Sequence, residues 1–176
     1  MKENFAELNL TTLISEKDIQ KKVQELGAEI TKLAKKTDLV VVCVLKGSFV
    51  FYSDLIRAID ADIRCEFLGV SSYGNGMKTS GEVKLTMDLT SSIEGKDVLL
   101  VEDIVDTGLT MDYLIRMLKS RKPKSVLTST LLLKPDALKT KVDLDYIGFK
   151  IGNEFVVGYG LDYQGFYRNL PYVARV

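Results

Sequence analysis

Residues 98–110 read VLLVEDIVDTGLT, and this stretch decides how the rest of the chain is interpreted. Its first four residues are apolar without alternation, which is typical of a strand buried on both faces of a parallel sheet. Two adjacent carboxylates, Glu102 and Asp103, follow the strand, and Asp106 stands three residues further on. Residues 107–110 then open a helix, where backbone N–H groups and the helix dipole favour a bound phosphate. The paired carboxylates suit a sugar diol, or a Mg²⁺ ion that bridges sugar and diphosphate.

Apolar strands and amphipathic helices alternate on both sides of this stretch. Apolar residues between 19 and 33 recur at spacings of four and three, which predicts a helix there. The sequence therefore predicts an α/β fold with a mainly parallel twisted sheet flanked by helices. Further helices are expected at 49–59 and 110–121, and strands at 39–45, 63–70, 82–88, 97–101, 125–133, 146–150 and 155–158. Ligands bind beyond the carboxyl ends of such strands, so we expect the site at residues 46–48, 102–110 and 134–136.

Two other phosphate-binding motifs are absent from the sequence. No GxxxxGK[ST] of a Walker A loop occurs, and Gly74-Asn75-Gly76 neither has a third glycine at the right offset nor opens a helix. Taken alone, Asp106-Thr107-Gly108 is equally well explained by a capped helix start, and Glu102-Asp103 by a solvated strand end. Together, after a buried strand, these features favour a site for a ribose phosphate.

The composition excludes several kinds of chemistry. The chain has no histidine, so it cannot form a Ser-His-Asp or Cys-His catalytic group or a histidine-ligated metal site. Cys43 and Cys65 are too few for a four-cysteine zinc site, and we expect both to be small buried hydrophobic residues. A catalytic metal should therefore be a hard cation, most plausibly Mg²⁺, held by carboxylates and substrate oxygens.

Length and charge point to one cytoplasmic domain. The 176 residues are enough for one core, and the 24 basic and 24 acidic residues give no overall field that would recruit nucleic acid or anionic lipid. The longest apolar run, Leu39–Leu45, is too short to span a membrane, and the start MKENFAEL lacks the apolar core of a signal peptide. We therefore expect no membrane partner and no nucleic-acid partner.

The stretch 98–110 resembles the phosphoribosyl diphosphate (PRPP) signature of the type I phosphoribosyltransferases, in which two acids precede D-T-G-x-T. Nearly the whole chain is similar to the hypoxanthine–guanine branch of that family. VLKGSFVFYSDL resembles the diphosphate loop and its helix, SSYG the mobile catalytic loop, and LLLKPD and EFVVGYGLDYQGFYRNLPYV the purine-binding end. The resemblance implies a single phosphoribosyltransferase domain over residues 1–176, with a core of about 36–145 and a small hood from about 1–14 and 146–176.

The resemblance also implies how PRPP is held. Glu102 and Asp103 would hold the ribose hydroxyls and, through them, the Mg²⁺–PRPP complex. Asp106 would face purine N7 and act as the general base. Leu109 stands where family members carry a lysine, so one charged contact to phosphate is absent. The residues implied in 5′-phosphate and ribose binding are Glu102, Asp103, Asp106, Thr107, Gly108, Leu109 and Thr110.

Two further groups of residues are implied around the diphosphate. Lys46 and Gly47 would form the diphosphate loop, and Arg168 would meet diphosphate with its cationic fork. Ser72 and Tyr73 would close over the reaction centre and exclude water. The residues alone also allow a plain turn, an exposed arginine and an ordinary flexible loop.

Four residues are implied at the purine. Lys134 would donate to the 6-oxo group, Phe155 would stack on the base, and Val156 would offer backbone atoms to its edge. Asp162 would lie near the 2-position and take a metal or its waters, which makes the implied metal set Glu102, Asp103 and Asp162. Without the resemblance, Phe155 and Val156 also fit core packing, and Lys134 fits a lysine that reaches solvent.

The resemblance thus implies a Mg²⁺-dependent enzyme of purine salvage, acting as a homodimer or homotetramer. It would transfer the 5-phosphoribosyl group of PRPP to N9 of a 6-oxopurine, giving IMP or GMP plus diphosphate. The alternatives are a noncatalytic PRPP-binding module and a nucleotide-responsive RNA-binding regulator. The regulator is suggested by Arg116–Lys124 (RMLKSRKPK), although a helix end with cations facing solvent explains the same residues.

Overall fold

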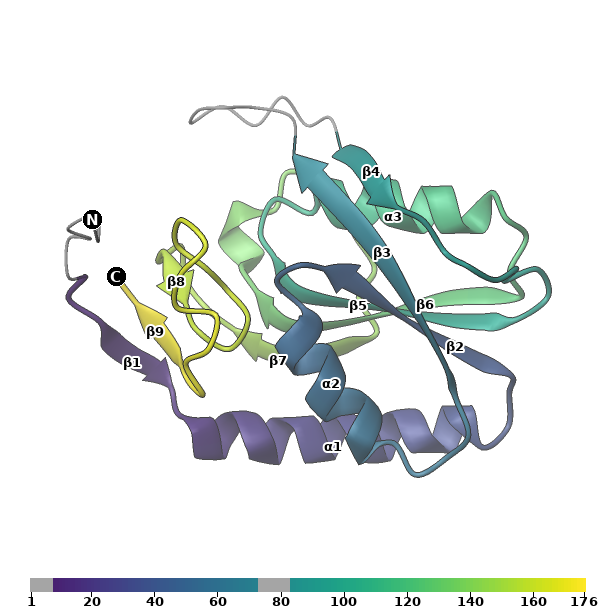
Figure 1. Ribbon diagram of the computed structural model, residues 1–176, viewed down its shortest axis with the longest axis horizontal. Helices are drawn as coiled ribbons and strands as arrows, with labels where there is room; N and C mark the ends of the chain where they lie inside the picture. Colours follow the sequence, from purple (N-terminus) through teal and green to yellow (C-terminus); the bar gives the residue numbers. More distant parts are fainter. Residues whose placement is uncertain (1–7, 73–82) are drawn as a thin grey trace, which may run out of the picture.

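A six-stranded sheet forms the centre of the computed structural model, which describes residues 8–72 and 83–176 (Figure 1). Its strand order is β4-β3-β2-β5-β6-β7, and every neighbouring pair is parallel except the edge pair β3–β4. The strands are β2 (Leu39–Leu45), β3 (Arg64–Ser72), β4 (Val83–Met87), β5 (Asp97–Val105), β6 (Ser125–Leu133) and β7 (Tyr146–Lys150). The predicted mainly parallel α/β fold is therefore confirmed.

Helices cover both faces of this sheet. One hydrophobic core lies beneath α1 (Glu16–Ala34) and α2 (Phe49–Ala58), and a second core lies beneath α3 (Leu109–Lys119) on the other face (Figure 1). In α1 the apolar stripe predicted from the spacing is buried, and the Ser15 hydroxyl caps the helix by accepting from the Asp18 backbone N–H. The buried strands and the two cores make the centre a rigid support for the loops at the strand ends.

A smaller sheet joins segments from both ends of the described chain. Strand β9 (Val173–Arg175) pairs antiparallel with β1 (Thr11–Ile14) on one side and with β8 (Val156–Val157) on the other. Residues 146–150, which the predicted hood included, instead form β7 and pair with β6 in the central sheet. Between β6 and β7 the chain makes a short 3₁₀ turn, η1 (Pro135–Ala137).

The structure corrects two details of the sequence analysis. Strand β5 does not end before the two carboxylates, because its pairing with β6 continues from Glu102 opposite Thr130 to Val105 opposite Leu133. Cys43 is buried as expected, but Cys65 is exposed. Cys65 lies on β3, next to the edge strand, whereas α2 packs mainly over β2 and β5 and reaches β3 through the contact of Tyr52 with Phe67. No helix in the described ranges is long and apolar enough to cross a membrane.

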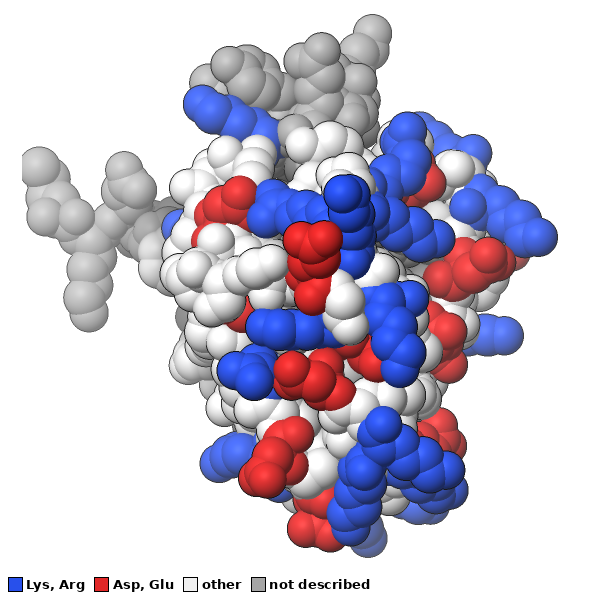
Figure 2. Space-filling model, turned by 90° about the vertical axis from the view of Figure 1, so that its right-hand side faces the viewer, with Lys and Arg blue, Asp and Glu red and all other residues white. Residues whose placement is uncertain are grey.

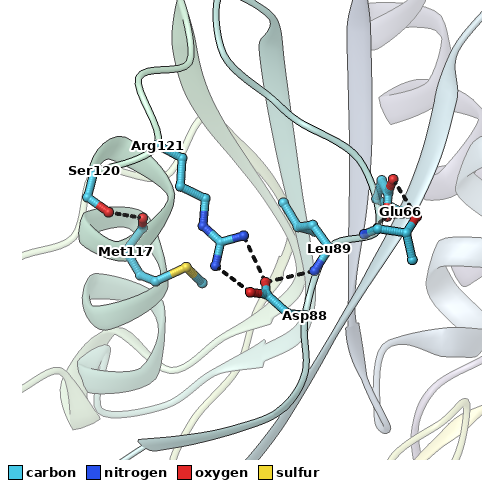
Figure 3. A network of polar contacts seen from close by, with 7 residues as sticks. Glu66, Asp88, Leu89, Met117, Ser120 and Arg121 are labelled. Carbon is cyan, nitrogen blue, oxygen red and sulfur yellow. Dashed lines mark hydrogen bonds and ion pairs between the residues drawn. The ribbon is translucent and has the colours of Figure 1, made fainter.

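Polar contacts hold the chain where it leaves β4 (Figure 3). The buried Glu66 side chain on β3 accepts hydrogen bonds from the Thr90 backbone N–H and hydroxyl at 3.0 Å. Asp88 forms an ion pair with Arg121, just beyond the end of α3, at 2.8 Å. Burial raises the pKa of Glu66, but hydrogen bonds from Thr90 and Ser91 outweigh it, so the pKa lies below its ordinary value. These contacts fix residues 88–91 against β3 and α3.

We predict that Glu66→Ala lowers the free energy of unfolding by about 1–3 kcal/mol, because the partly buried Thr90 N–H loses its acceptor. Since folding lowers the pKa of Glu66, its contribution is present at neutral pH and is lost as the pH falls below 4.5, its ordinary pKa. Urea unfolding at pH 7 and pH 3.5 measures both effects, with the exposed Glu94→Ala as control. A Glu66→Ala variant as stable as Glu94→Ala at pH 7 would contradict the prediction.

Candidate active site

A cavity of about 280 Å³ lies at the carboxyl ends of β2, β5 and β6. Its walls come from the loop after β2, the end of β5, the residue after β6 and the segment 155–168. Eight of the residues predicted for the site line it: Gly47, Asp103, Asp106, Lys134, Phe155, Val156, Asp162 and Arg168. The parallel sheet thus brings together residues that are up to 121 positions apart in the sequence, between Gly47 and Arg168.

A second cavity of about 90 Å³ adjoins the first and shares Asp106 and Ile104 with it. It is lined by Glu102, Thr107, Gly108 and Thr110 at the start of α3. Gly108 precedes the first helical residue and has a φ of +79°, in the left-handed region that favours glycine. The first N–H groups of a helix have no partner inside the helix, so this cavity offers donors to an anion.

Leu109 begins α3 but does not line this smaller cavity. The position can still contribute a backbone N–H, while its side chain adds no charge to the cavity. This agrees with the expectation that one charged contact to phosphate is missing.

Glu102 and Asp103 stand side by side in β5 but line different cavities, Glu102 the smaller one and Asp103 the larger one. Burial raises the pKa of both carboxyl groups, and their mutual repulsion raises that of Glu102 further. Asp103 accepts from the Ile104 N–H at 2.8 Å, while the buried Glu102 Oε2 has no hydrogen-bond partner within residues 8–72 and 83–176. An unpaired buried carboxylate oxygen is the group that a ligand would satisfy.

The loop after β2 lies directly on Asp103. The Leu45–Lys46 peptide bond is cis, a feature that residue types alone did not indicate. A Cβ added at Gly47 would overlap the Asp103 carboxylate, and a Cβ added at Gly160 would overlap the Gly47 carbonyl. The two glycines therefore allow the Gly47 backbone to lie against the Asp103 carboxylate, and the Gly160 backbone against that of Gly47, more closely than side chains would permit.

Lys134 follows β6 and points into the larger cavity. Only 8 % of the residue is exposed, so it does not reach solvent as a surface lysine would. Its ammonium lies 3.5 Å from the carboxylate of Asp106, whose side chain is half exposed. This places a cationic donor and a carboxylate acceptor side by side at the cavity wall.

Asp162 and Arg168 form a closer pair that lines the same cavity. Arg168 Nη2 lies 2.6 Å from Asp162 Oδ1, and the Gly165 N–H donates to Asp162 Oδ2 at 2.7 Å. Arg168 Nη1 donates to the Gly160 carbonyl at 2.6 Å. Both oxygens of Asp162 are therefore engaged by the protein itself.

The predicted metal set of Glu102, Asp103 and Asp162 does not form a metal centre by itself. In the part of the chain that the structure describes, no three carboxylate or cysteine side chains are grouped so that they could hold an ion. A cation bound near Glu102 and Asp103 would take its other ligands from substrate oxygens and water.

The remaining predicted residues have mixed outcomes. Phe155 is 53 % exposed and meets Tyr163 edge to face, so it is not a core residue, whereas Val156 is buried. Ser72 ends β3, and the prediction for its side chain and for Tyr73 lies outside the described residues.

The sequence analysis missed Tyr159 and Gly160, which contact α2 and the loop after β2. The only sequence signal for them is the pair of glycines in Gly158-Tyr159-Gly160, which indicates an unusual turn.

The basic segment Arg116–Lys124 is largely neutralised. Arg116 pairs with Asp112 at 2.8 Å, Arg121 with Asp88, and Lys124 with Asp97 at 3.3 Å. Figure 2 shows acidic side chains interleaved with the basic ones on the end of the molecule where α3 finishes. This arrangement weighs against a surface built for RNA.

Comparisons with known proteins show the family to which the chain belongs. A family model for the phosphoribosyl transferase domain matches residues 11–164. The hypoxanthine-guanine phosphoribosyltransferase of Bacillus subtilis (strain 168) is 51 % identical over 162 residues, which cover 92 % of this chain and 90 % of that protein. The corresponding Staphylococcus aureus (strain Mu50 / ATCC 700699) protein is 50 % identical over 164 residues, covering 93 % of this chain and 92 % of its own.

Solved structures give the same result. A hypoxanthine phosphoribosyltransferase from Staphylococcus aureus superposes with a TM-score of 0.90 and 49 % identity, over 94 % of this chain and 90 % of that one. A hypoxanthine-guanine phosphoribosyltransferase from Bacillus anthracis superposes with a TM-score of 0.89 and 48 % identity, over 94 % of this chain and 98 % of that one. With half of its residues identical to theirs along nearly its whole length, the chain belongs to the phosphoribosyltransferase family, among the hypoxanthine-guanine phosphoribosyltransferases.

Proposed function

We propose that the protein transfers the 5-phosphoribosyl group of PRPP to N9 of a 6-oxopurine, forming IMP from hypoxanthine or GMP from guanine and releasing diphosphate. The observation that carries this proposal is the shared wall of two cavities at Asp106. On one side lies an anion site at the start of α3, and on the other lies a cavity with Lys134 and the aromatic Phe155. A nucleoside monophosphate has the corresponding parts, a phosphate and a base joined by the ribose.

Each end of the proposed site matches part of the substrates. The N–H groups at the start of α3 would bind the 5′-phosphate, and Glu102 with Asp103 would bind the ribose hydroxyls. Gly47 and Arg168 line the larger cavity and do not line the smaller one, and we assign them to the diphosphate. Phe155 exposes its ring at the same cavity and would stack on the purine.

The pair Lys134–Asp106 would select the base and assist the reaction. Lys134 would donate to the 6-oxo group, a contact that the 6-amino group of adenine cannot accept. As N9 attacks C1 of the ribose and the bond to diphosphate breaks, positive charge grows on the purine. Asp106 would relieve it by accepting the N7 proton as a general base.

The described residues fit a magnesium ion. The oxygens of Glu102 and Asp103 are hard donors, and the unpartnered Glu102 Oε2 leaves a position for a cation or a hydroxyl that it orients. When bound, Mg²⁺ would offset the negative charge that develops on diphosphate.

The site is tested by measuring diphosphate release from PRPP and Mg²⁺ with hypoxanthine, guanine, xanthine, adenine and uracil in turn. We expect turnover with hypoxanthine and guanine and none with adenine or uracil, because only 6-oxopurines accept from Lys134 at that position. Binding of PRPP without turnover of any base would contradict the proposed activity and favour a noncatalytic PRPP-binding module.

We predict that Asp106→Ala lowers kcat by about 10²–10⁴-fold, the usual contribution of a general base, while the Kd of IMP changes much less. Single-turnover kinetics and calorimetric titration measure the two effects. Asp112→Ala is the matched control, because Asp112 lies in the first turn of α3, the helix that follows Asp106, but pairs with Arg116. Equal losses in kcat and IMP affinity would instead indicate a purely phosphate-binding role for Asp106.

We also propose a cytoplasmic homodimer or homotetramer. Phe49 on α2 and Phe67 on β3 are 45 % and 40 % exposed, an amount of apolar surface that a second copy would cover. In the Trypanosoma cruzi hypoxanthine phosphoribosyltransferase, 40 % identical to this chain, the C-terminal region has a role in oligomeric state and enzymatic activity.

Light scattering after size-exclusion chromatography should give at least twice the 19.7 kDa chain mass, and Phe49→Glu should lower it. The exposed Phe155→Glu, at the cavity, is the control for a new surface charge and should leave the mass unchanged. A monomeric wild-type protein would contradict the prediction.

A further inference from the structure

The turn formed by residues 158–161 connects two parts of the molecule that are far apart in sequence. Its ends exchange backbone hydrogen bonds, Gly158 N–H to the Leu161 carbonyl at 3.0 Å and Leu161 N–H to the Gly158 carbonyl at 3.1 Å. Between them Tyr159, with a φ of +50°, is 95 % buried, and its hydroxyl donates to Asp54 Oδ2 on α2 at 2.6 Å. The turn is thus joined to the helix that follows the loop after β2.

The same turn lies on both groups that would bind diphosphate. Gly160, with a φ of +100°, approaches the Gly47 carbonyl so closely that no Cβ would fit between them. Its own carbonyl accepts from Arg168 Nη1 at 2.6 Å, and its N–H donates to the Arg168 carbonyl at 2.9 Å. The position of Gly160 therefore constrains how closely the Gly47 backbone approaches Asp103. It also helps to set the direction of the Arg168 guanidinium.

The hydroxyl of Tyr159 adds a directional hydrogen bond to the packing of its ring. A phenylalanine ring would fill the same space, but only the hydroxyl bonds to a carboxylate, and hydrogen bonds to charged groups are stronger and more directional than neutral ones. Asp54 is itself held, because its other oxygen pairs with Arg57 one turn further along α2. Arg57 therefore helps to orient the acceptor of Tyr159.

We propose that Tyr159 is a positioning residue for the diphosphate end of the site, acting through its hydrogen bond to Asp54. The bond holds the turn 158–161 against the Gly47 loop and so sets the spacing among Gly47, Asp103 and Arg168. The inference rests on the proposed function. It assigns no contact between Tyr159 and a substrate.

The test is Tyr159→Phe, assayed by calorimetric titration of diphosphate with Mg²⁺, by the KM for PRPP and by the Kd of IMP. We expect the diphosphate Kd and the PRPP KM to rise about tenfold, the size of effect expected when a hydrogen bond to a charged group is lost. The Kd of IMP, which carries no diphosphate and uses the donors at the start of α3, should change less than about twofold.

Tyr52→Phe is the matched control. Tyr52 lies on α2, as Asp54 does, is 97 % buried, and donates its hydroxyl to the Val41 carbonyl on β2 at 3.1 Å. Both variants lose a buried tyrosine hydroxyl, so both should lower the melting temperature, but only Tyr159→Phe should weaken diphosphate. Equal weakening by the two variants would overturn the proposal, as would equal weakening of diphosphate and IMP.

Variants of the acceptor complete the experiment. Asp54→Asn keeps an oxygen for the Tyr159 hydroxyl but loses the charge, so it should weaken diphosphate less than Asp54→Ala, which should behave as Tyr159→Phe does. The double variant Tyr159→Phe/Asp54→Ala should be no worse than either single one, and additive losses would overturn the proposal. Wild-type protein that binds neither PRPP nor diphosphate would instead refute the proposed function, so the two failures are distinguishable.

Discussion

The constraint on which the site depends is the burial of two adjacent carboxylates at the end of a central strand. Removing ionised carboxylates from water is unfavourable unless partners replace the lost hydration. Asp103 accepts a hydrogen bond from the Ile104 N–H, and the Gly47 backbone lies against its carboxylate. Glu102 keeps an oxygen without a hydrogen-bond partner among the described residues. The raised pKa of each group records this incomplete compensation. The protein thus keeps in its folded state an unfavourable arrangement that a ligand with hydroxyls or positive charge relieves.

Such an arrangement needs a support that does not relax. The carboxylates sit on β5, which has a strand on both sides and apolar cores above and below. Close-packed cores resist small displacements, so the ends of neighbouring strands keep their spacing, and the loops beyond them can present functional side chains from a rigid support. The contacts of Glu66 and Asp88 extend this support to the segment that returns from β4 (Figure 3).

The sequence predicted those features that residue type and periodicity encode locally. The unbroken apolar run 39–45, the spacing in α1 and the D-T-G-x-T stretch each depend on neighbouring residues, and each has its counterpart in the structure. The features it missed depend on contacts between distant segments. Nothing near Cys65 indicates that the helix packed on its side of the sheet leaves this position exposed. Likewise the contact of Gly160 with Gly47, 113 positions away, follows only from the complete fold.

The two ion pairs of the larger cavity differ in a way that bears on their roles. Arg168 and Asp162 meet at 2.6 Å, and further hydrogen bonds to Gly160 and Gly165 hold each partner. Such a pair fixes the direction of a guanidinium. Lys134 and Asp106 are 3.5 Å apart, at the outer limit of a hydrogen bond, so each retains capacity for another partner. A purine that presents its 6-oxo group to Lys134 and its N7 to Asp106 would contact both side chains without breaking a strong bond. In the proposed reaction, the Asp162–Arg168 pair would therefore give the leaving diphosphate a fixed guanidinium, whereas Lys134 and Asp106 would stay free to bind the base and accept its proton.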